Sequence, residues 1–252
     1  MGVAGDVRLT TIGTGAAYGR PGEVQACHLV RAGGADICLD LGAGAFNALT
    51  AHVRPEDLDL VVISHLHPDH FIDLLALRVY MVWGPGAGRQ VRIAGPPGLR
   101  EVLARFGEDG LDSALVFEDL VGEAPETVLG AAVRLRHRQV PHLPPTYATR
   151  IDVGGRSVCF GADCAPNDAL AVLGAGADVL ITECSFGTGE VPAGAMHLNA
   201  RTAGEIARAS GAARLLLTHC FPEWDPDDAA REAGLIAGIP VVAARPGGTV
   251  VL

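Results

Sequence analysis

Four short apolar segments of this chain each end directly at a side chain that can bind a metal ion or carry a proton. The segments are residues 60–64, 158–162, 180–182 and 215–218, and they are followed by His65, Asp163, Glu183 and His219. Short apolar runs of this kind are typical of buried strands. Open α/β sheets place their functional sites at the carboxyl ends of their strands. We therefore expect these strand ends to converge and to assemble one polar cluster on a rigid apolar base.

Candidate metal ligands are most closely spaced in the sequence His-Leu-His-Pro-Asp-His, which begins at His65. It contains four strong metal-ligand side chains within six residues, namely His65, His67, Asp69 and His70. Side chains of extended backbone alternate with period two, so His65 and His67 can point the same way. Pro68 makes the chain leave the strand, and this can turn Asp69 and His70 toward a second ion. Imidazole and carboxylate ligands together suit zinc, and less often iron or manganese.

The rest of the chain alternates strands with helices and predicts a single α/β domain over residues 1–252. The expected strands are residues 7–12, 28–31, 37–41, 58–64, 157–161, 179–182, 215–218, 241–244 and 249–252, with a pair of strands within 128–140. A helix is expected at residues 97–106, with proline near its start and glycine after its end. A second helix is expected at residues 199–210, where Asn199 is the predicted N-cap and Gly211 the predicted stop.

Composition and net charge disfavour some classes of binding partner. The chain has 252 residues, 49% of them hydrophobic, a formal net charge of −10 and no lysine. Such a surface repels polyanions, whereas nucleic-acid binders usually need a basic patch. Nucleic acid is therefore not an expected partner.

The expected location is the cytoplasm. Residues 1–6 show no basic flank and no apolar run, so no signal peptide is predicted. No apolar stretch approaches the length of a membrane span. The six cysteines show no CxxC spacing, and we expect reduced thiols.

Several motifs resemble those of the metallo-β-lactamase superfamily, and the resemblance spans nearly the whole chain. Residues 37–44 are similar to the first motif, in which Asp40 supports the site without binding metal. Residues 64–70 match the second motif. His142, Asp163 and His219 lie where the third, fourth and fifth motifs place a ligand. The resemblance implies the fold of that superfamily, a four-layer αββα sandwich.

Carried over position by position, the resemblance implies a centre with two zinc ions, for which manganese or iron are alternatives. One zinc would be held by His65, His67 and His142 and the other by Asp69, His70 and His219, with Asp163 bridging both. Two-metal centres activate a shared water as the nucleophile and stabilise developing oxygen charge. His67 stands where flavodiiron-type relatives typically carry a carboxylate, which favours a hydrolytic zinc pair over redox iron.

Within the superfamily, the chain is most similar to the ribonuclease Z-like branch and its phosphodiesterase relatives. Glu183 and His197 match a hydrogen-bonded pair that lies beside the metals in that branch, where the histidine stabilises or protonates the oxygen leaving phosphorus. The residues assigned to catalysis are Asp69, Glu183 and His197. Ribonuclease Z enzymes usually insert a long tRNA-binding arm where His142 and Asp163 are here only 21 positions apart.

The leading hypothesis is therefore a di-zinc phosphodiesterase that acts on a small phosphodiester such as a cyclic nucleotide. One alternative is hydrolysis of another small ester, a lactone, a thioester or a sulfate ester within a biosynthetic pathway. A second is an endonuclease like the tRNA 3′-processing enzymes but without the usual arm. A third is a metal-stabilised binding protein without turnover, against which the complete ligand set argues.

Two further patterns leave their function open. Arg134, Arg136 and Arg138 alternate with other residues, and the wet face of a strand is a better interpretation than a strip that attracts phosphate. Residues 80–83, which include an aromatic residue at each end, fit either a substrate pocket or the interface of a homodimer.

Overall fold

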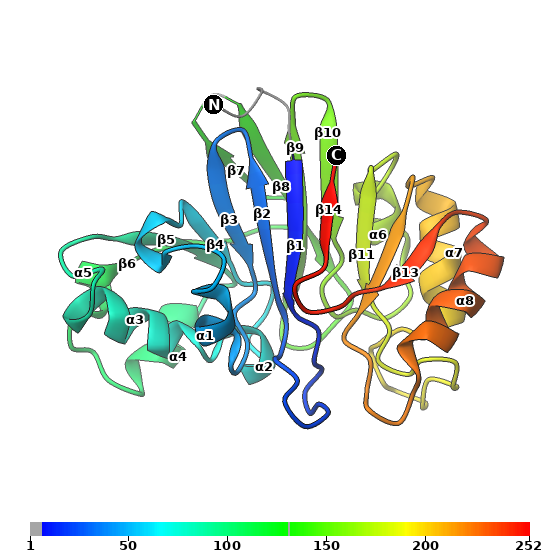
Figure 1. Ribbon diagram of the computed structural model, residues 1–252, viewed down its shortest axis with the longest axis horizontal. Coiled ribbons are helices and arrows are strands. Elements are labelled where there is room, and N and C mark those ends of the chain that lie inside the picture. Colours follow the sequence, from blue (N-terminus) through cyan, green and yellow to red (C-terminus); the bar gives the residue numbers. More distant parts are fainter. Residues whose placement is uncertain (1–6, 131) are drawn as a thin grey trace.

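The chain is described by a computed structural model over residues 7–130 and 132–252, in which two seven-stranded sheets lie face to face (Figure 1). The first sheet has, side by side, β14 (Thr249–Val251), β1 (Val7–Gly13), β2 (Cys27–Ala32), β3 (Ala35–Leu39), β4 (Leu60–Val62), β5 (Val91–Gly95) and β6 (Leu115–Asp119). The second has β13 (Val241–Ala243), β12 (Leu215–Thr218), β11 (Val179–Glu183), β10 (Arg156–Phe160), β9 (Thr146–Val153), β8 (Val133–Val140) and β7 (Glu126–Leu129).

Helices cover the outer face of each sheet. The first sheet carries α1 (Ala45–Leu49), a 3₁₀ turn at Pro55–Asp57, α2 (Pro68–Phe71), α3 (Leu74–Trp83), α4 (Leu99–Ala104) and α5 (Leu111–Ala114). The second carries α6 (Asp168–Leu173), α7 (Ala200–Ser210) and α8 (Pro226–Ala237). In Figure 1 these two groups of helices lie on the left and on the right of the strands. The layers are therefore helix, sheet, sheet and helix, and the predicted αββα sandwich is confirmed.

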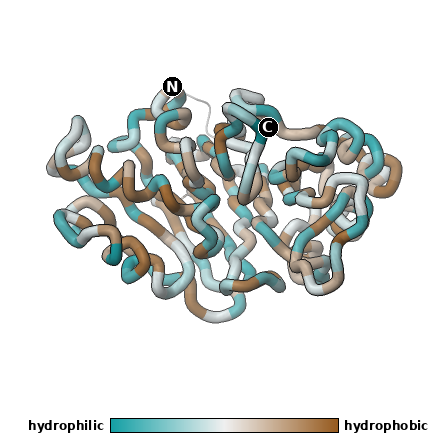
Figure 2. The backbone as a smooth tube through the Cα atoms, turned by 90° about the horizontal axis from the view of Figure 1, so that it is seen from below, coloured by the Kyte–Doolittle hydropathy of each residue, from teal (hydrophilic) through white to brown (hydrophobic). Residues whose placement is uncertain are grey.

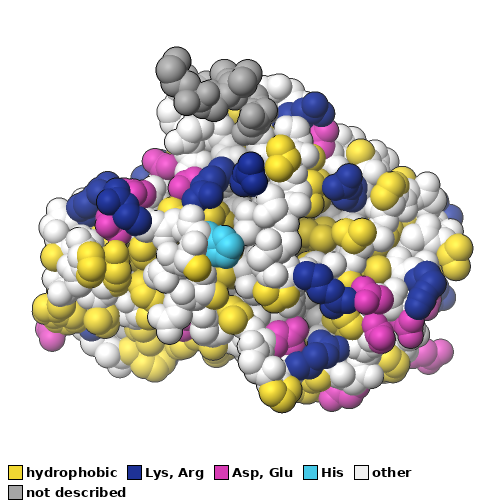
Figure 3. All heavy atoms as spheres, in the orientation of Figure 1, with side chains coloured by type: hydrophobic (Ala, Val, Ile, Leu, Met, Phe, Trp, Pro, Cys, Tyr) yellow, Lys and Arg dark blue, Asp and Glu magenta, His cyan; other side chains and the backbone are white. Residues whose placement is uncertain are grey.

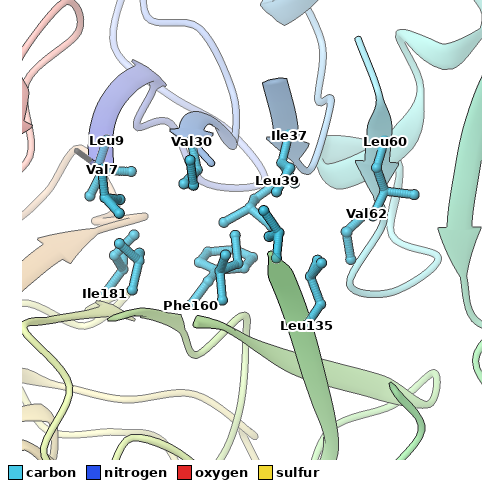
Figure 4. Packing of buried hydrophobic residues seen from close by; sticks show 14 of the residues in the cluster. Val7, Leu9, Val30, Ile37, Leu39, Leu60, Val62, Leu135, Phe160 and Ile181 are labelled. Carbon is cyan, nitrogen blue, oxygen red and sulfur yellow. The ribbon is translucent and has the colours of Figure 1, made fainter. Parts of the chain in front are cut away.

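Three apolar clusters hold the layers together. The central one lies between the sheets, where Leu9, Ile37 and Ile181 from different strands meet the ring of Phe160 (Figure 4). The other two lie between each sheet and its helices, so hydrophobic segments are found on both sides of the sheets as well as between them (Figure 2). Strands that are buried on both faces read as continuous apolar runs, which explains why these segments show little alternation.

Most of the expected elements are present, with changes at their ends. Helix α7 begins after Asn199, whose side chain accepts a hydrogen bond from the backbone N–H of Thr202, and it ends at Gly211 with φ 64°. The strand expected to reach residue 41 ends at Leu39, because Asp40 turns into the left-handed region with φ 59°. The helix expected at 97–106 is shorter, at Leu99–Ala104. The patterns did not identify β5, β6, β9 or α8.

None of the helices in the described ranges combines the length and the apolar character that a membrane crossing requires. The prediction that no signal peptide precedes the domain concerns residues 1–6, which lie outside the described residues.

Candidate metal centre

The loops that follow β3, β10 and β12 each contain a residue with strained backbone. Asp40, Ala162 and His219 have φ values of 59°, 53° and 56°, and they are the only residues other than glycine with positive φ in the described parts of the chain. The left-handed region is costly for residues with a Cβ atom and is found where the surrounding structure enforces it, often at functional sites. All three residues are buried and lie at the carboxyl ends of strands, where the candidate ligands gather.

A first group of ligand atoms comes from the loops after β4, β8 and β10. One atom from each of His65, His67, His142 and Asp163 lies within 4.8 Å of the others. Nδ1 of His67 is 3.0 Å from Nε2 of His65 and 3.4 Å from Nε2 of His142. The structure thus brings together the residues that the resemblance assigned to one ion.

A second group adjoins the first. Asp69 and His70 come from α2, which begins at Pro68, and His219 follows β12. Nε2 of His219 is 3.2 Å from both Nε2 of His70 and Oδ2 of Asp69. Oδ2 of Asp163 is 3.5 Å from Nε2 of His70 and 3.5 Å from Nε2 of His219. Asp163 therefore lies between the two groups, as a bridging ligand must.

The hydrogen bonds of the imidazole rings test whether these groups suit a cation. Nδ1–H of His70 donates to Oδ2 of Asp40 at 2.7 Å, and Nδ1–H of His142 donates to the backbone carbonyl of Met196 at 3.0 Å. These acceptors have no hydrogen to give, so in the neutral rings the lone pair is on Nε2. Metal-binding histidines almost always anchor their other nitrogen in this way.

Two serine hydroxyls give the same result for His65 and His219, whereas His67 faces the other rings of its group with Nδ1. Ser64 Oγ donates to Asp40 at 2.8 Å and lies 3.0 Å from Nδ1 of His65. Ser185 Oγ donates to Glu183 at 2.6 Å and lies 3.1 Å from Nδ1 of His219. Each hydroxyl hydrogen is directed at a carboxylate, so each oxygen can accept from a ring N–H. Nε2 of His70 and Nε2 of His219 are 3.2 Å apart, so in the neutral rings no hydrogen lies between their lone pairs, and a bound cation resolves this conflict.

Burial and charge fit the same conclusion. Burial lowers the pKa of His65, His67 and His142, which keeps their rings neutral and able to bind metal. Burial would raise the pKa of Asp163, but the neighbouring rings of His219 and His70 outweigh it and hold that pKa well below its ordinary value. For His70 burial lowers the pKa, whereas Asp163 and Asp40 outweigh burial and raise it. A proton and a metal ion therefore compete for this ring.

Glu183 and His197 form a pair beside these groups. Nδ1–H of His197 donates to Oε1 of Glu183 at 2.9 Å and lies 3.8 Å from Oδ2 of Asp163. Glu183 is fixed in turn by backbone N–H groups of Cys164 and Ser185. Burial lowers the pKa of His197, but the hydrogen bond and the charge of Glu183 outweigh burial and raise it to about 9.

Sequence patterns missed two of the residues that orient the ligands. Ser64 and Ser185 each contact a ligand ring and a carboxylate, and their only signal was their position directly beside His65 and Glu183. Asp40 contacts His70 and Ser64, including the Ser64 backbone N–H at 2.7 Å, as the resemblance implied.

Other candidate residues lie outside the site. Arg134 and Arg136 are exposed on β8 and pair with Glu126 and Asp152. All six cysteines are buried free thiols. A cavity of about 630 Å³ is bounded by His219 but by none of the other residues of the two ligand groups. On the face shown in Figure 3, arginines lie beside acidic side chains instead of forming a continuous basic surface.

Comparison with known proteins agrees with this geometry. A sequence model of the β-lactamase superfamily domain matches residues 36–220. The probable metallo-hydrolase YhfI of Bacillus subtilis is 27% identical over 226 residues, which are 90% of this chain and 91% of that protein. A ribonuclease Z of Mycobacterium bovis is 29% identical over 246 residues, 87% of this chain and 88% of the relative.

Solved structures share the fold. The crystal structure of YhfI, described as a metallo-β-lactamase fold protein, has a TM-score of 0.88 at 25% identity and covers 98% of this chain and 100% of its own. The short form of human tRNase Z has a TM-score of 0.80 at 21% identity, with 96% and 98% covered. The matched domain, the fold and the two groups of ligand atoms together show that the chain belongs to the metallo-β-lactamase superfamily and is a metallo-hydrolase.

Proposed function

We propose that the protein is a di-zinc phosphodiesterase that acts on a small phosphodiester such as a cyclic nucleotide. The observation that carries the proposal is the Glu183–His197 pair, with Nδ1 of His197 3.8 Å from the carboxylate shared by the two ligand groups. Hydrolysis of a phosphodiester needs a donor for the departing oxygen, and a positioned histidine is the commonest such group.

The ligand sets define the metal positions. His65, His67 and His142 would hold one zinc, and Asp69, His70 and His219 the other, with Asp163 shared. Two zinc ions bound there would supply an activated nucleophile and positive charge opposite the phosphoryl oxygens.

His197 performs the proton transfer. Its Nδ1–H is held by Glu183, which fixes the ring and leaves Nε2 to carry the transferable proton. Glu183 raises the pKa of this ring and so favours a protonated Nε2, which can donate to an alkoxide leaving group. Asp163 and Glu183, both buried, keep that positive ring next to negative charge.

A small substrate fits the chain better than tRNA. Between His142 and Asp163 the chain forms only β9 and β10, joined by the turn Gly154–Gly155, with no inserted arm. The relative named ribonuclease Z supports phosphodiester chemistry, and the absent insertion and the net charge of −10 support a substrate smaller than RNA.

Substrate class is tested with zinc-loaded protein and a panel of cyclic nucleotides, linear phosphodiesters, lactones, thioesters and sulfate esters. We expect kcat/KM to be largest for a phosphodiester. A lactone, thioester or sulfate ester that is hydrolysed much faster would contradict the phosphodiesterase proposal and favour the alternative ester hydrolase.

A precursor tRNA provides the second test. We expect no 3′ cleavage, or only very weak cleavage, at physiological salt, because the segment that would hold the arm contains only a tight hairpin. A ribonuclease Z assayed in parallel is the positive control. Efficient cleavage by this protein would overturn the small-substrate proposal.

A further inference from the structure

A row of aromatic rings leads from His197 to the surface. The ring of Phe186 contacts His197 with centroids 6.2 Å apart, and it contacts Phe221 edge-on at 5.7 Å. Phe221 in turn stacks on Tyr18, with centroids 4.8 Å apart and planes inclined by 20°. Tyr18 is 53% exposed, so one end of the row is open to solvent and the other touches the proposed general acid.

This concentration of rings is unusual for the chain. The whole sequence contains only 7 Phe, 3 Tyr and 2 Trp. Three of these twelve rings lie in one row, and they come from three separate segments, the β1–β2 loop, the loop after β11 and the loop after β12. A half-exposed tyrosine that stacks on another ring beside a candidate site offers a flat apolar surface to a ligand.

Polar contacts join the loops that carry these rings, and they hold the rings in place without a bound ligand. Nη2 of Arg20 donates to the backbone carbonyl of Trp224 at 2.6 Å, and also to those of Phe221 and Pro222 at 3.4 Å. Glu23 accepts from the backbone N–H of Arg20 at 2.8 Å. The hydroxyl of Tyr18 donates to Glu223 at 3.0 Å. The β1–β2 loop and the loop after β12 are thus joined at several points.

We infer that Tyr18, Phe221 and Phe186 form a stacking surface for a planar ring of the substrate, so that the phosphodiester is one that carries a nucleobase. This inference rests on the proposed function. With the phosphodiester at the metal centre beside His197, the sugar carries the base outward along the row. Stacking on aromatic rings tolerates different bases, because every base has a π-face. The surface therefore selects nucleotides as a class.

The test compares two substrates on zinc-loaded protein. One is 3′,5′-cyclic AMP, and the other is a methyl riboside 3′,5′-cyclic phosphate, which lacks the base. We expect wild type to show a KM for cyclic AMP that is lower by roughly tenfold, in line with stacking of one base. Tyr18→Leu should reduce this difference several-fold, whereas Tyr18→Phe, which keeps the stacked ring, should retain it. Phe106→Leu, which removes a ring that is 61% exposed after α4, is the control and should behave as wild type.

Each outcome bears on a different claim. If both compounds are hydrolysed with the same KM by wild type, or if Tyr18→Leu keeps the full preference for cyclic AMP, the inference is wrong while the phosphodiesterase proposal stands. A preference lost equally in Phe106→Leu would also overturn it. Hydrolysis of neither compound, with turnover of another ester class, would overturn the proposed function and this inference with it.

Discussion

At the scale of single residues, the site is built from rings whose orientation is fixed by their second nitrogen. His65, His70, His142 and His219 each present Nε2 to the centre because Nδ1 contacts an oxygen of another residue. Such partners fix both the tautomer and the direction of a ligand. The chemistry thus depends on Asp40, Ser64 and Ser185 as well as on the ligands themselves.

Asp163 should matter more for metal content than any single histidine ligand. Its Oδ2 lies 3.5 Å from rings of the second group and also belongs to the first group, so it can contact both ions and offset their repulsion. We expect Asp163→Ala to lose more zinc per chain than His67→Ala or His142→Ala, as measured by elemental analysis after equal dialysis. Fully loaded wild type that holds at most one ion per chain would contradict the two-metal assignment.

Removal of His197 should affect proton transfer and not metal binding. We expect His197→Ala to keep both metals and to lower kcat by ~10² for substrates with an alkoxide leaving group. The loss should shrink for a nitrophenolate leaving group, which departs without a proton. Glu183→Gln should show a milder form of the same effect. Equal losses for good and poor leaving groups would show that His197 only binds substrate or maintains the shape of the site.

The pH profile gives a separate check on His197. Its raised pKa of about 9 means that the ring is protonated below that pH and loses its proton above it. Bound cations lower this value by repelling the proton. We therefore expect kcat for alkoxide leaving groups to fall as the pH rises through a pKa at or below about 9, and this alkaline decline should be absent in His197→Ala. A wild-type profile without the decline would contradict the acid role.

At the scale of elements, loops and helix ends position the site on a rigid base. Helix α7 begins three residues after His197, and its N-terminus is closed by a capping box between Asn199 and Thr202. Asn199 also donates to the carbonyl of Gly189 at 2.7 Å, which ties the loop before His197 to the helix. The placement of the proposed acid thus depends on a helix cap that the sequence already indicated.

Loss of this cap should reduce stability. We expect Asn199→Ala to lower the free energy of unfolding by about 1–2 kcal/mol, because a backbone N–H loses its acceptor at the start of α7. Asn199→Asp keeps that acceptor and should cost less. Urea unfolding followed by circular dichroism measures both variants. Equal stability of Asn199→Ala and wild type would show that the capping box contributes little.

At the scale of the whole molecule, stability depends on buried histidines away from the ligands. His137 lies between Thr127 and Thr149, which contact its two ring nitrogens at 3.1 and 3.0 Å. Burial lowers its pKa to about 4. The unfolded chain binds a proton near the ordinary value of about 6.5, so the folded state loses stability as the pH falls from about 6.5 to 4.

A variant isolates this contribution. For one histidine with this shift, the loss amounts to about 3 kcal/mol across that range of pH. Wild type should lose this free energy of unfolding as the pH falls from 7 to 4, whereas His137→Leu has no ring to protonate. We therefore expect the free energy of unfolding of His137→Leu, relative to that of wild type, to rise by up to that amount over the same range. Denaturant unfolding at several pH values, with the metal removed from both proteins by chelation, measures the difference. A difference that does not vary with pH would contradict the buried, neutral state of His137.

The sequence by itself determined the residue types of the site and the strands that carry them. His65, Asp163, Glu183 and His219 follow apolar runs that are buried strands, and the helix caps at Asn199 and Gly211 are local signals. Such features depend on neighbours in the chain, so they can be read from it. The close spacing of ligand side chains at residues 65–70 likewise indicates metal binding.

Tertiary structure decided what depends on partners distant in the chain. The positive φ of Asp40, Ala162 and His219 is imposed by packing at strand ends and has no local signal. The contact of His142 with Met196, and the stack of Tyr18 on Phe221, join residues more than fifty positions apart. Strands β5, β6 and β9 were also missed, because pairing with neighbouring strands defines them. Helix α8 was missed although it carries local signals, namely the cap Asp225, Pro226 in its first turn and Gly238 after its end. Only the folded sandwich brings these groups together at one edge of the two sheets, where they form a site.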